Sequence, residues 1–200
     1  MLEAVIFDVG ETLLDESHAW EDIAQACGVP LLTLMGVLGG VIARGRPHRE
    51  VFALLGVDMP SSERPFTKDD LYPDALPALE SVRSAGCRVG IAGNQSPQRQ
   101  AELEAIFGGA ELVITSGKLG VEKPEPAFFT RLLELIGVPA ERCAYVGDRV
   151  DNDVEPALAA GMTAVFILRG PWAYLQRESV PASAIVIGGL DELPSRLGFS

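Results

Sequence analysis

The sequence lacks the basic excess that marks proteins with polyanionic partners. Among its 200 residues, 16 are Lys or Arg and 28 are Asp or Glu, which gives a formal net charge of −12 and a pI near 4.6. A field of this sign repels polyanions, so we expect no nucleic-acid partner and no anionic membrane surface. A small anionic substrate is still compatible with this charge if local cations or a metal ion bind it.

Paired cysteines and long apolar runs are also missing. The cysteines Cys27, Cys87 and Cys143 form no Cys-x-x-Cys pair and lie among apolar residues, which is typical of small core side chains in a reducing compartment. This pattern indicates neither a disulfide framework nor a zinc site. The sequence has no uncharged apolar run of about 18 residues, and its start enters a predicted strand without a basic and apolar leader. We therefore expect a soluble, cytoplasmic protein without a membrane partner.

Strand-like and helix-like segments alternate along most of the sequence. From Tyr72 onward, short apolar runs are separated by segments with helical spacing, which is typical of βαβ units. The predicted strands are 4–7, 88–92, 112–115, 143–146, 163–168 and 184–187, and the helices predicted after Tyr72 are 75–85, 97–107, 125–136, 154–160 and 191–197. The sequence therefore predicts an α/β fold with a doubly wound, Rossmann-like parallel sheet.

One interval near the start interrupts this alternation. Between residues 15 and 69, apolar residues recur at helical spacing in three sets, with Gly and Pro breaks at 28–30 and 45–47 and a proline-flanked stretch at 60–65. No strand pattern occurs in the interval. We predict a small all-helical unit at 15–69, inserted into an α/β core domain made of residues 1–14 and 70–200.

Polar residues follow the predicted strands at the positions where ligands bind in open α/β sheets. Asp8 follows the strand 4–7, Asn94 the strand 88–92 and Asp148 the strand 143–146, while Lys123 lies beyond the strand 112–115 and Asp153 five residues after Asp148. Right-handed parallel connections bring these strand ends to one edge. Each residue alone also fits a structural role, as a turn cap, a solvated lysine or a capped helix start. Together they predict a site in which a carboxylate acts as nucleophile or metal ligand.

The order and spacing of these residues resemble the motifs of the haloacid dehalogenase-like (HAD) hydrolase superfamily over essentially the whole chain. The matching residues are Phe7-Asp8 with Thr12 four residues on, Asn94, Gly120-x-x-Lys123-Pro124-x-Pro126, and Gly147-Asp148-x-x-x-x-Asp153 followed by Ala160-Gly161-Met162. The helical interval 15–69 resembles the family's helical cap. The resemblance therefore implies a HAD-like core with a small cap.

The resemblance also implies a mechanism and a cofactor. Asp8 would attack a phosphoryl group and form an aspartyl-phosphate, which water then hydrolyses. Mg²⁺ would be held by Asp8, by the backbone carbonyl of Gly10 and by Asp148. The ion and Lys123 would offset the repulsion between carboxylate and phosphate, and Asp153 would orient a metal-bound water or Lys123.

The sequence departs from the family's phosphatase pattern at two positions. The second Asp, which normally lies two residues after the nucleophile and moves protons, is Gly10 here, and the phosphate-binding Ser or Thr after the second strand is Gly93. Backbone N–H groups, Asn94 and Thr12 would then bind the substrate. General acid-base help is typically worth about 10²–10⁴ in rate, so its loss favours substrates with good leaving groups. Glu11, beside the gap, is a candidate acid or a solvated turn residue.

Basic residues cluster once in the predicted cap. Arg44, Arg46, His48 and Arg49 fall within six residues. If this loop faces the strand ends, its arginines would bind the distal anionic part of a substrate through bidentate contacts. Solvated helix ends are the alternative interpretation.

These observations predict a Mg²⁺-dependent phosphatase that acts on a small phosphorylated metabolite, as a monomer or homodimer. A 2-haloacid dehalogenase is one alternative, because such enzymes also lack the second Asp and need no metal, although the retained Asp148 and Asp153 argue against it. The other alternative is a non-catalytic HAD-like module that binds phosphate or a partner, since such a module would tolerate both losses.

Overall fold

A computed structural model describes residues 1–60 and 64–199 of the chain. Within them, six strands form one parallel sheet: β1 Ala4–Phe7, β2 Arg88–Gly93, β3 Leu112–Thr115, β4 Cys143–Gly147, β5 Thr163–Ile167 and β6 Ile185–Ile187. The strand order is β3-β2-β1-β4-β5-β6, and every neighbouring pair is parallel. The six predicted strands are confirmed to within one residue at each end.

The first strand lies at the centre of this sheet. Val5 of β1 pairs with Val89 on one side and with Ala144 on the other, and all four residues of β1 are fully buried. Side chains of a strand alternate between the two faces of a sheet, so Val5 packs in one apolar cluster and Ile6 in the other. A strand that is covered on both faces needs an unbroken apolar run, which explains the pattern of residues 4–7.

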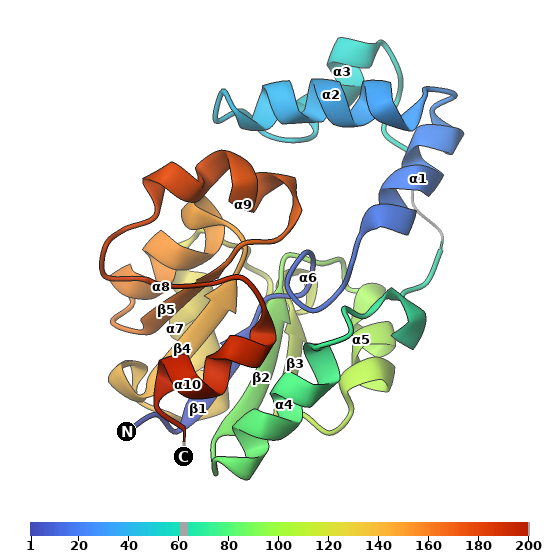
Figure 1. The fold of residues 1–200 in the computed structure, drawn as a ribbon. Helices are drawn as coiled ribbons and strands as arrows, with labels where there is room; N and C mark the ends of the chain where they lie inside the picture. Colours follow the sequence, from blue (N-terminus) through green and yellow to red (C-terminus); the bar gives the residue numbers. More distant parts are fainter. Residues whose placement is uncertain (61–63, 200) are drawn as a thin grey trace.

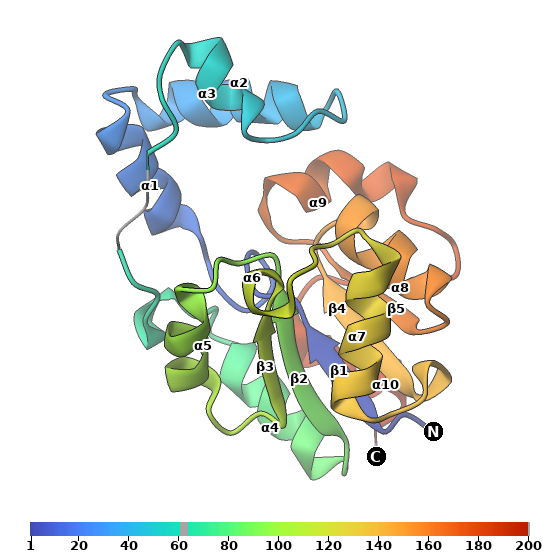
Figure 2. The ribbon, with the colours of Figure 1, turned by 180° about the vertical axis from the view of Figure 1, so that it is seen from behind.

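Helices cover both faces of the sheet, as the doubly wound prediction requires. The helices of the described residues are α1 Ser17–Ala26, α2 Leu31–Ile42, α3 Glu50–Leu55, α4 Ala75–Ser84, α5 Arg99–Phe107, α6 Ser116–Leu119, α7 Pro126–Ile136, α8 Glu155–Ala159, α9 Gly170–Gln176 and α10 Leu193–Leu197. Helices α4, α5 and α10 contribute to one apolar cluster, and α7, α8 and α9 to the other. Figure 1 shows the face with α4 and α10, and Figure 2 the face with α7.

Two of these helices do not follow from the sequence pattern. Helix α6 has only four residues, too few for a helical period to be visible. Helix α9 begins with Gly170 and Pro171, which at the level of sequence resemble a turn. The predicted helix 154–160 is also shorter than expected, because a π-helical turn at Val150–Val154 precedes α8.

Helices α1, α2 and α3 lie within the interval predicted as a cap. They stand over the carboxyl edge of the sheet (Figures 1 and 2) and pack around Leu34, Leu38 and Phe52. Trp172 of α9 joins this cluster and ties the cap helices to the core. The bounds 15–69 of a separate domain stay a prediction, and residues 61–63 of its closing stretch 60–65 lie outside the described residues.

Helices α1 and α2 are the only described segments whose length and composition approach those of a membrane span. They do so only as a pair that is bent by 108°. No single helix among the described residues is long and apolar enough to cross a bilayer.

We expect the substitution Gly36→Ala to stabilise the cap. Gly36 lies inside α2, and a Cβ added there meets no atom within 4 Å, so alanine would remove the entropic cost of a helical glycine, about 0.5–1 kcal/mol. Gly28 is a matched control, because its added Cβ is equally free of contacts while its φ of 65° is left-handed. Gly28→Ala should therefore lower stability by about 1–2 kcal/mol.

Urea unfolding followed by tryptophan fluorescence measures both changes, since Trp20 and Trp172 belong to the cap cluster. A stabilising effect of Gly28→Ala, or a destabilising effect of Gly36→Ala, would contradict this account of the two glycines.

Candidate active site

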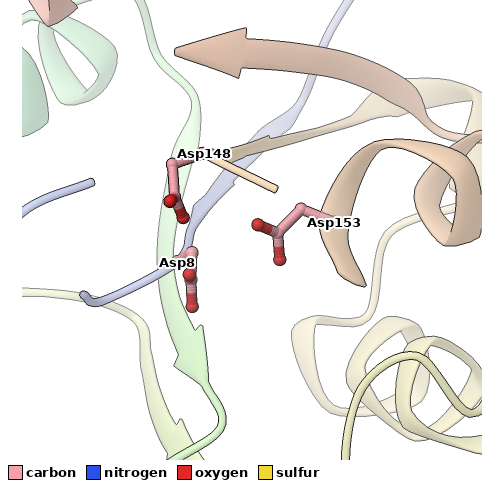
Figure 3. A group of neighbouring side chains, drawn as sticks. All are labelled: Asp8, Asp148 and Asp153. Atoms are coloured by element: carbon pink, nitrogen blue, oxygen red, sulfur yellow. The ribbon is translucent and has the colours of Figure 1, made fainter. Parts of the chain in front are cut away.

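The carboxyl ends of β1 and β4 bring three aspartates together at the centre of the sheet edge. Asp8 follows β1, Asp148 follows β4, and Asp153 lies in the π-helical turn after β4. All three are buried, and one carboxylate oxygen of each lies within 4.8 Å of the others. Figure 3 shows the three carboxylates around a common space. The predicted convergence of these strand ends is confirmed by the parallel sheet.

Lys123 provides the positive charge of this cluster. Its Nζ donates hydrogen bonds to Oδ1 of Asp8 at 2.7 Å and to Oδ1 of Asp153 at 2.6 Å, and the residue is 3% exposed. Burial alone would lower the pKa of the ammonium group, but the carboxylates of Asp153 and Asp8 outweigh it and hold the pKa above its ordinary value. The lysine is therefore a fixed cation at the sheet edge.

The side chain of Asn94 fixes the backbone of this lysine. Its Nδ2 donates to the carbonyl oxygen of Lys123 at 2.8 Å, and its Oδ1 accepts from the Lys123 backbone N–H at 2.8 Å. The loop after β3 is thereby tied to the end of β2. The substrate-binding role of Asn94 stays a prediction, and the structure adds a positioning role for its side-chain amide.

The cluster contains more carboxyl groups than cationic groups. Three carboxyl groups converge here, and one ammonium group pairs with two of them, Asp8 and Asp153. Burial, together with Asp153 and Asp8, raises the pKa of Asp148 well above its ordinary value. Burial also raises the pKa of Asp153 to about 6, although Lys123 acts in the opposite direction. Converging carboxylate oxygens with unbalanced charge are the donor set that suits a hard divalent cation, so these residues fit Mg²⁺.

Two glycines allow the carboxylates to approach the strand ends closely. A Cβ added at Gly93 would lie 2.8 Å from Oδ1 of Asp8, and one added at Gly147 would lie 2.4 Å from Cγ of Asp153. Both distances are shorter than van der Waals contact. A serine or threonine at position 93 would therefore displace Asp8 in this chain, which gives a physical reason for the glycine there.

Glu11, in the turn after β1, is held by hydrogen bonds to both of its carboxylate oxygens. Glu11 has a left-handed backbone, with φ of 50°, and such a conformation costs of order 1 kcal/mol or more unless its surroundings hold it. Its Oε2 accepts from the hydroxyl of Tyr72 at 2.7 Å, and its Oε1 accepts from the backbone N–H of Glu16 at 3.0 Å. Burial raises the pKa of this carboxyl group. The acid role of Glu11 stays a prediction, but both of its oxygens are engaged.

Glu16 fills the space that a side chain at position 10 would need. A Cβ added at Gly10 would lie 2.5 Å from Oε1 and 2.7 Å from Cδ of Glu16. Burial raises the pKa of the Glu16 carboxyl group to about 7, and the nearby carboxylates of Glu11 and Asp8 act in the same direction. The sequence analysis did not identify Glu16. The only signal was an acidic residue shortly after a position where an acid is missing.

A cavity of about 820 Å³ lies over the cluster, between the cap and the carboxyl edge of the sheet. Seven of the predicted site residues line it: Asp8, Gly10, Glu11, Arg49, Asn94, Lys123 and Asp148. The other predicted residues, Thr12, Arg44, Arg46, Gly93 and Asp153, are not among its lining residues. The side chain of Thr12 is fully buried, and its Oγ1 has no hydrogen-bond partner within the described residues.

The basic cluster of the cap is divided between the cavity and the outer surface. His48 and Arg49 line the cavity. Arg44 instead donates from Nη1 to the carbonyl oxygen of Gly40 at 2.6 Å, and Arg46 pairs with Glu50. Arg49 is therefore the one member of the predicted arginine set, among the described residues, that reaches the cavity. Substrate-binding roles for all three arginines stay predictions.

Aromatic residues form a cavity wall that the sequence analysis did not identify. Trp172 of α9 lies 6.4 Å from Trp20 of α1 and 6.0 Å from His48, measured between ring centroids. The Arg149 guanidinium lies 5.2 Å from the Trp172 ring centroid and binds Asp151 through two hydrogen bonds. All four of the residues Trp20, His48, Arg149 and Trp172 line the cavity.

The chain is similar in sequence to several proteins that are named as phosphatases. A glyceraldehyde 3-phosphate phosphatase from Methanopyrus kandleri is 36% identical over 104 residues, which cover 50% of this chain and 45% of that protein. A phosphoserine phosphatase from Thermus thermophilus is 38% identical over 127 residues, or 62% of this chain and 49% of that protein. These matches thus span about half the length of the two relatives. A phosphatase from Mycobacterium tuberculosis, MT3486, is 28% identical over 84% of this chain and 88% of that protein.

Solved structures and a family model extend the match along the chain. An L-2-haloacid dehalogenase from Xanthobacter autotrophicus has a TM-score of 0.71 at 20% identity, covering 99% of both chains. A HAD phosphatase from Thermococcus onnurineus has a TM-score of 0.66 at 23% identity, covering 100% of this chain and 99% of that one. At these identities the structures show a shared fold alone. The model of haloacid dehalogenase-like hydrolases matches residues 2–161, and the chain therefore belongs to the haloacid dehalogenase-like hydrolase family.

Proposed function

We propose that this chain is a Mg²⁺-dependent phosphatase that acts on a small phosphorylated metabolite through an aspartyl-phosphate. The observation that supports it most strongly is the buried cluster of Asp8, Asp148 and Asp153 around Lys123 beneath the cavity. Relatives that are named phosphatases point in the same direction.

The contacts of Lys123 support a nucleophilic role for Asp8. Lys123 holds Oδ1 of Asp8, which fixes the orientation of the carboxylate, while Asp153 holds the lysine from the other side. Asp8 lines the cavity, so an oxygen of this carboxylate is available to phosphorus. Asp8, Asp148 and the carbonyl of Gly10 would hold Mg²⁺, which when bound supplies positive charge against the phosphoryl oxygens.

The cavity walls support a substrate with a small organic part. Arg49 and His48 approach from the cap, and Trp20 and Trp172 provide apolar surface. Lys123 is nearly buried below them. An anionic phosphoryl group would bind near the lysine, and the remainder of the molecule would face the aromatic and basic residues of the cap side.

We expect the protein to hydrolyse acetyl phosphate and para-nitrophenyl phosphate in the presence of Mg²⁺, and EDTA to abolish the activity. Asp8→Asn should lower kcat by about 10⁴-fold or more, because it removes the nucleophile. Asp58→Asn, an exposed aspartate in the described part of the cap region, is the matched control and should leave kcat unchanged.

Steady-state assays of purified protein measure this directly. Absence of turnover at high enzyme concentration, or equal rates for the wild type and Asp8→Asn, would refute the proposal. Halide release from 2-chloropropionate in EDTA would support the dehalogenase alternative instead.

Mg²⁺ should raise the melting temperature of the protein. A ligand that binds only the folded state stabilises it by about 2.7 kcal/mol at 100 times its Kd, and the unbalanced charge of the cluster favours a cation. Asp148→Asn should lose this response. Asp151→Asn is the control, because this half-exposed aspartate pairs with Arg149 outside the cluster. Thermal melts at several Mg²⁺ concentrations, together with calorimetric titration, test the site independently of turnover. If Mg²⁺ raises the melting temperature of Asp148→Asn as much as that of the wild type, this ligand set is ruled out.

Lys123→Met should destabilise the fold strongly in the absence of metal. Loss of one partner of a buried ion pair leaves an uncompensated charge and costs about 3–5 kcal/mol. Lys118→Met, an exposed lysine on α6, should change stability by less than about 0.5 kcal/mol.

The loss in Lys123→Met should be smaller at pH 5 than at pH 7.5. The folded state raises the pKa of Asp153 to about 6 and raises that of Asp148, so it binds more protons than the unfolded chain, and its stability falls as pH rises through this range. Without Lys123, the stability of the folded state depends even more on protonation of these carboxylates, because the ammonium group no longer offsets their charge. Urea unfolding at both pH values measures the effect, and an equal loss at both would contradict this charge balance.

A further inference from the structure

We propose that the carboxyl group of Glu16 carries out the proton transfers for which Gly10 has no side chain. This inference rests on the proposed phosphatase function and deepens it, because it decides which phosphate esters the site can cleave. It concerns a residue in the segment between core and cap, outside the strand-end motifs.

The geometry beside Gly10 carries the inference. The three atoms nearest to a Cβ built on Gly10 all belong to the Glu16 carboxyl group, with Oε1 at 2.5 Å, Cδ at 2.7 Å and Oε2 at 3.1 Å. The carboxyl group therefore occupies the volume into which a side chain at position 10 would project. Glu16 and Asp8 line the same cavity, so an acid is present in the cavity of the nucleophile although residue 10 cannot supply one.

Glu11 holds Glu16 in this position. Glu11 Oε1 accepts from the Glu16 backbone N–H at 3.0 Å, and Glu11 Oε2 accepts from the Tyr72 hydroxyl at 2.7 Å. A Cβ added at Gly170 would lie 2.6 Å from Cγ of Glu11, so α9 packs tightly against the same side chain. Glu11 is thus a positioning residue, and Glu16 begins the first turn of α1, where its carbonyl accepts from the N–H of Trp20 at 3.0 Å.

Other carboxyl groups near the nucleophile are less suited to this role. Asp153 is held by Lys123 and by the backbone N–H of Arg149. Asp148 belongs to the proposed metal cluster. Glu122 lines the cavity but is exposed. Glu16 is the remaining acid on the cavity wall, within the described residues, whose carboxyl group lies against Gly10.

The proposed transfers balance in two steps. In the first, a carboxylate oxygen of Asp8 attacks phosphorus, the bond from phosphorus to the ester oxygen breaks, and the departing alkoxide takes the proton of the Glu16 carboxyl group. In the second, the Glu16 carboxylate takes a proton from water, whose oxygen attacks phosphorus, and the bond from phosphorus to Asp8 breaks. Inorganic phosphate leaves, and Asp8 and Glu16 regain their starting states.

This assignment changes the substrate class that Gly10 alone suggests. Without an acid, the site would be restricted to acyl and aryl phosphates, whose leaving groups depart without a proton. With Glu16 as acid, phosphate monoesters of ordinary alcohols become substrates. The proposal therefore extends the substrate class to small alkyl phosphates.

Glu16→Gln distinguishes a proton-transfer role from a structural role. With an alkyl phosphate such as glycerol phosphate, kcat/KM should fall about 10²–10⁴-fold. With para-nitrophenyl phosphate the first step needs no proton, so rapid mixing should show a burst of one nitrophenolate per active site, followed by slow turnover as the aspartyl-phosphate persists. Glu21→Gln, at an exposed position of α1, is the control and should behave as the wild type.

The results separate the two levels of the proposal. A wild type that turns over neither substrate overturns the phosphatase function and this inference with it. If the wild type is active, either of two results would overturn the role of Glu16 alone. In one, Glu16→Gln hydrolyses the alkyl phosphate as fast as the wild type does. In the other, Glu16→Gln loses the same factor in rate on both substrates and shows no burst.

A second set of variants tests the geometry without relying on activity. Gly10→Ala should lower the melting temperature, because its Cβ collides with Glu16, and this loss should disappear in a Glu16→Ala background. Gly10→Asp combined with Glu16→Ala should recover alkyl-phosphate hydrolysis relative to Glu16→Ala alone. Equal melting losses for Gly10→Ala in both backgrounds would overturn the inference.

Discussion

The ion pairs of Lys123 are the constraint on which the candidate site depends. A buried ammonium group is costly unless carboxylates compensate it, and this one is compensated by Asp8 and Asp153. These contacts require three strands to end at the same level. Asp8 follows β1 and Asp153 lies beyond β4, while Asn94, which follows β2, holds the loop that carries Lys123. The glycines at the ends of β2 and β4 leave room for these contacts. The central sheet and the cluster are therefore one unit.

This unit could be predicted from the sequence because it is set by backbone topology. Apolar runs locate the strands, parallel connections place their ends at one edge, and the residue after each strand is read directly. Asp8 and Asp148, which come directly after β1 and β4, follow from this reasoning. Lys123 lies beyond β3, and the resemblance of its stretch Gly120–Pro126 to a family motif identifies it. The role of the Asn94 amide in holding Lys123 follows from neither, because it depends on a hydrogen-bond pair between loops that lie 29 residues apart.

The cavity wall could not be predicted, because its residues come from the cap and from α9. Whether a cap residue faces the cavity depends on how three short helices sit over the sheet. Helical spacing gives their apolar faces but not their placement, so Arg44 and Arg49 are equivalent in sequence, while only Arg49 lines the cavity. Trp172 lies in a segment whose first residues resemble a turn in the sequence, so its role was not predicted, yet its side chain packs with the cap helices and links them to the core.

Gly10 and Glu16 show how a chemical role can be separated from a sequence position. A motif assigns the acid to a residue number, whereas the reaction requires only a carboxyl group at a place in space. In this chain the space beside Gly10, in the cavity that Asp8 also lines, is filled from the segment that leads into α1, and Glu11 and Tyr72 fix that segment to the core. Under the proposed assignment, the nucleophile belongs to the central strand and the acid to the junction with the cap. Proton transfer is then linked to the cap's position over the sheet.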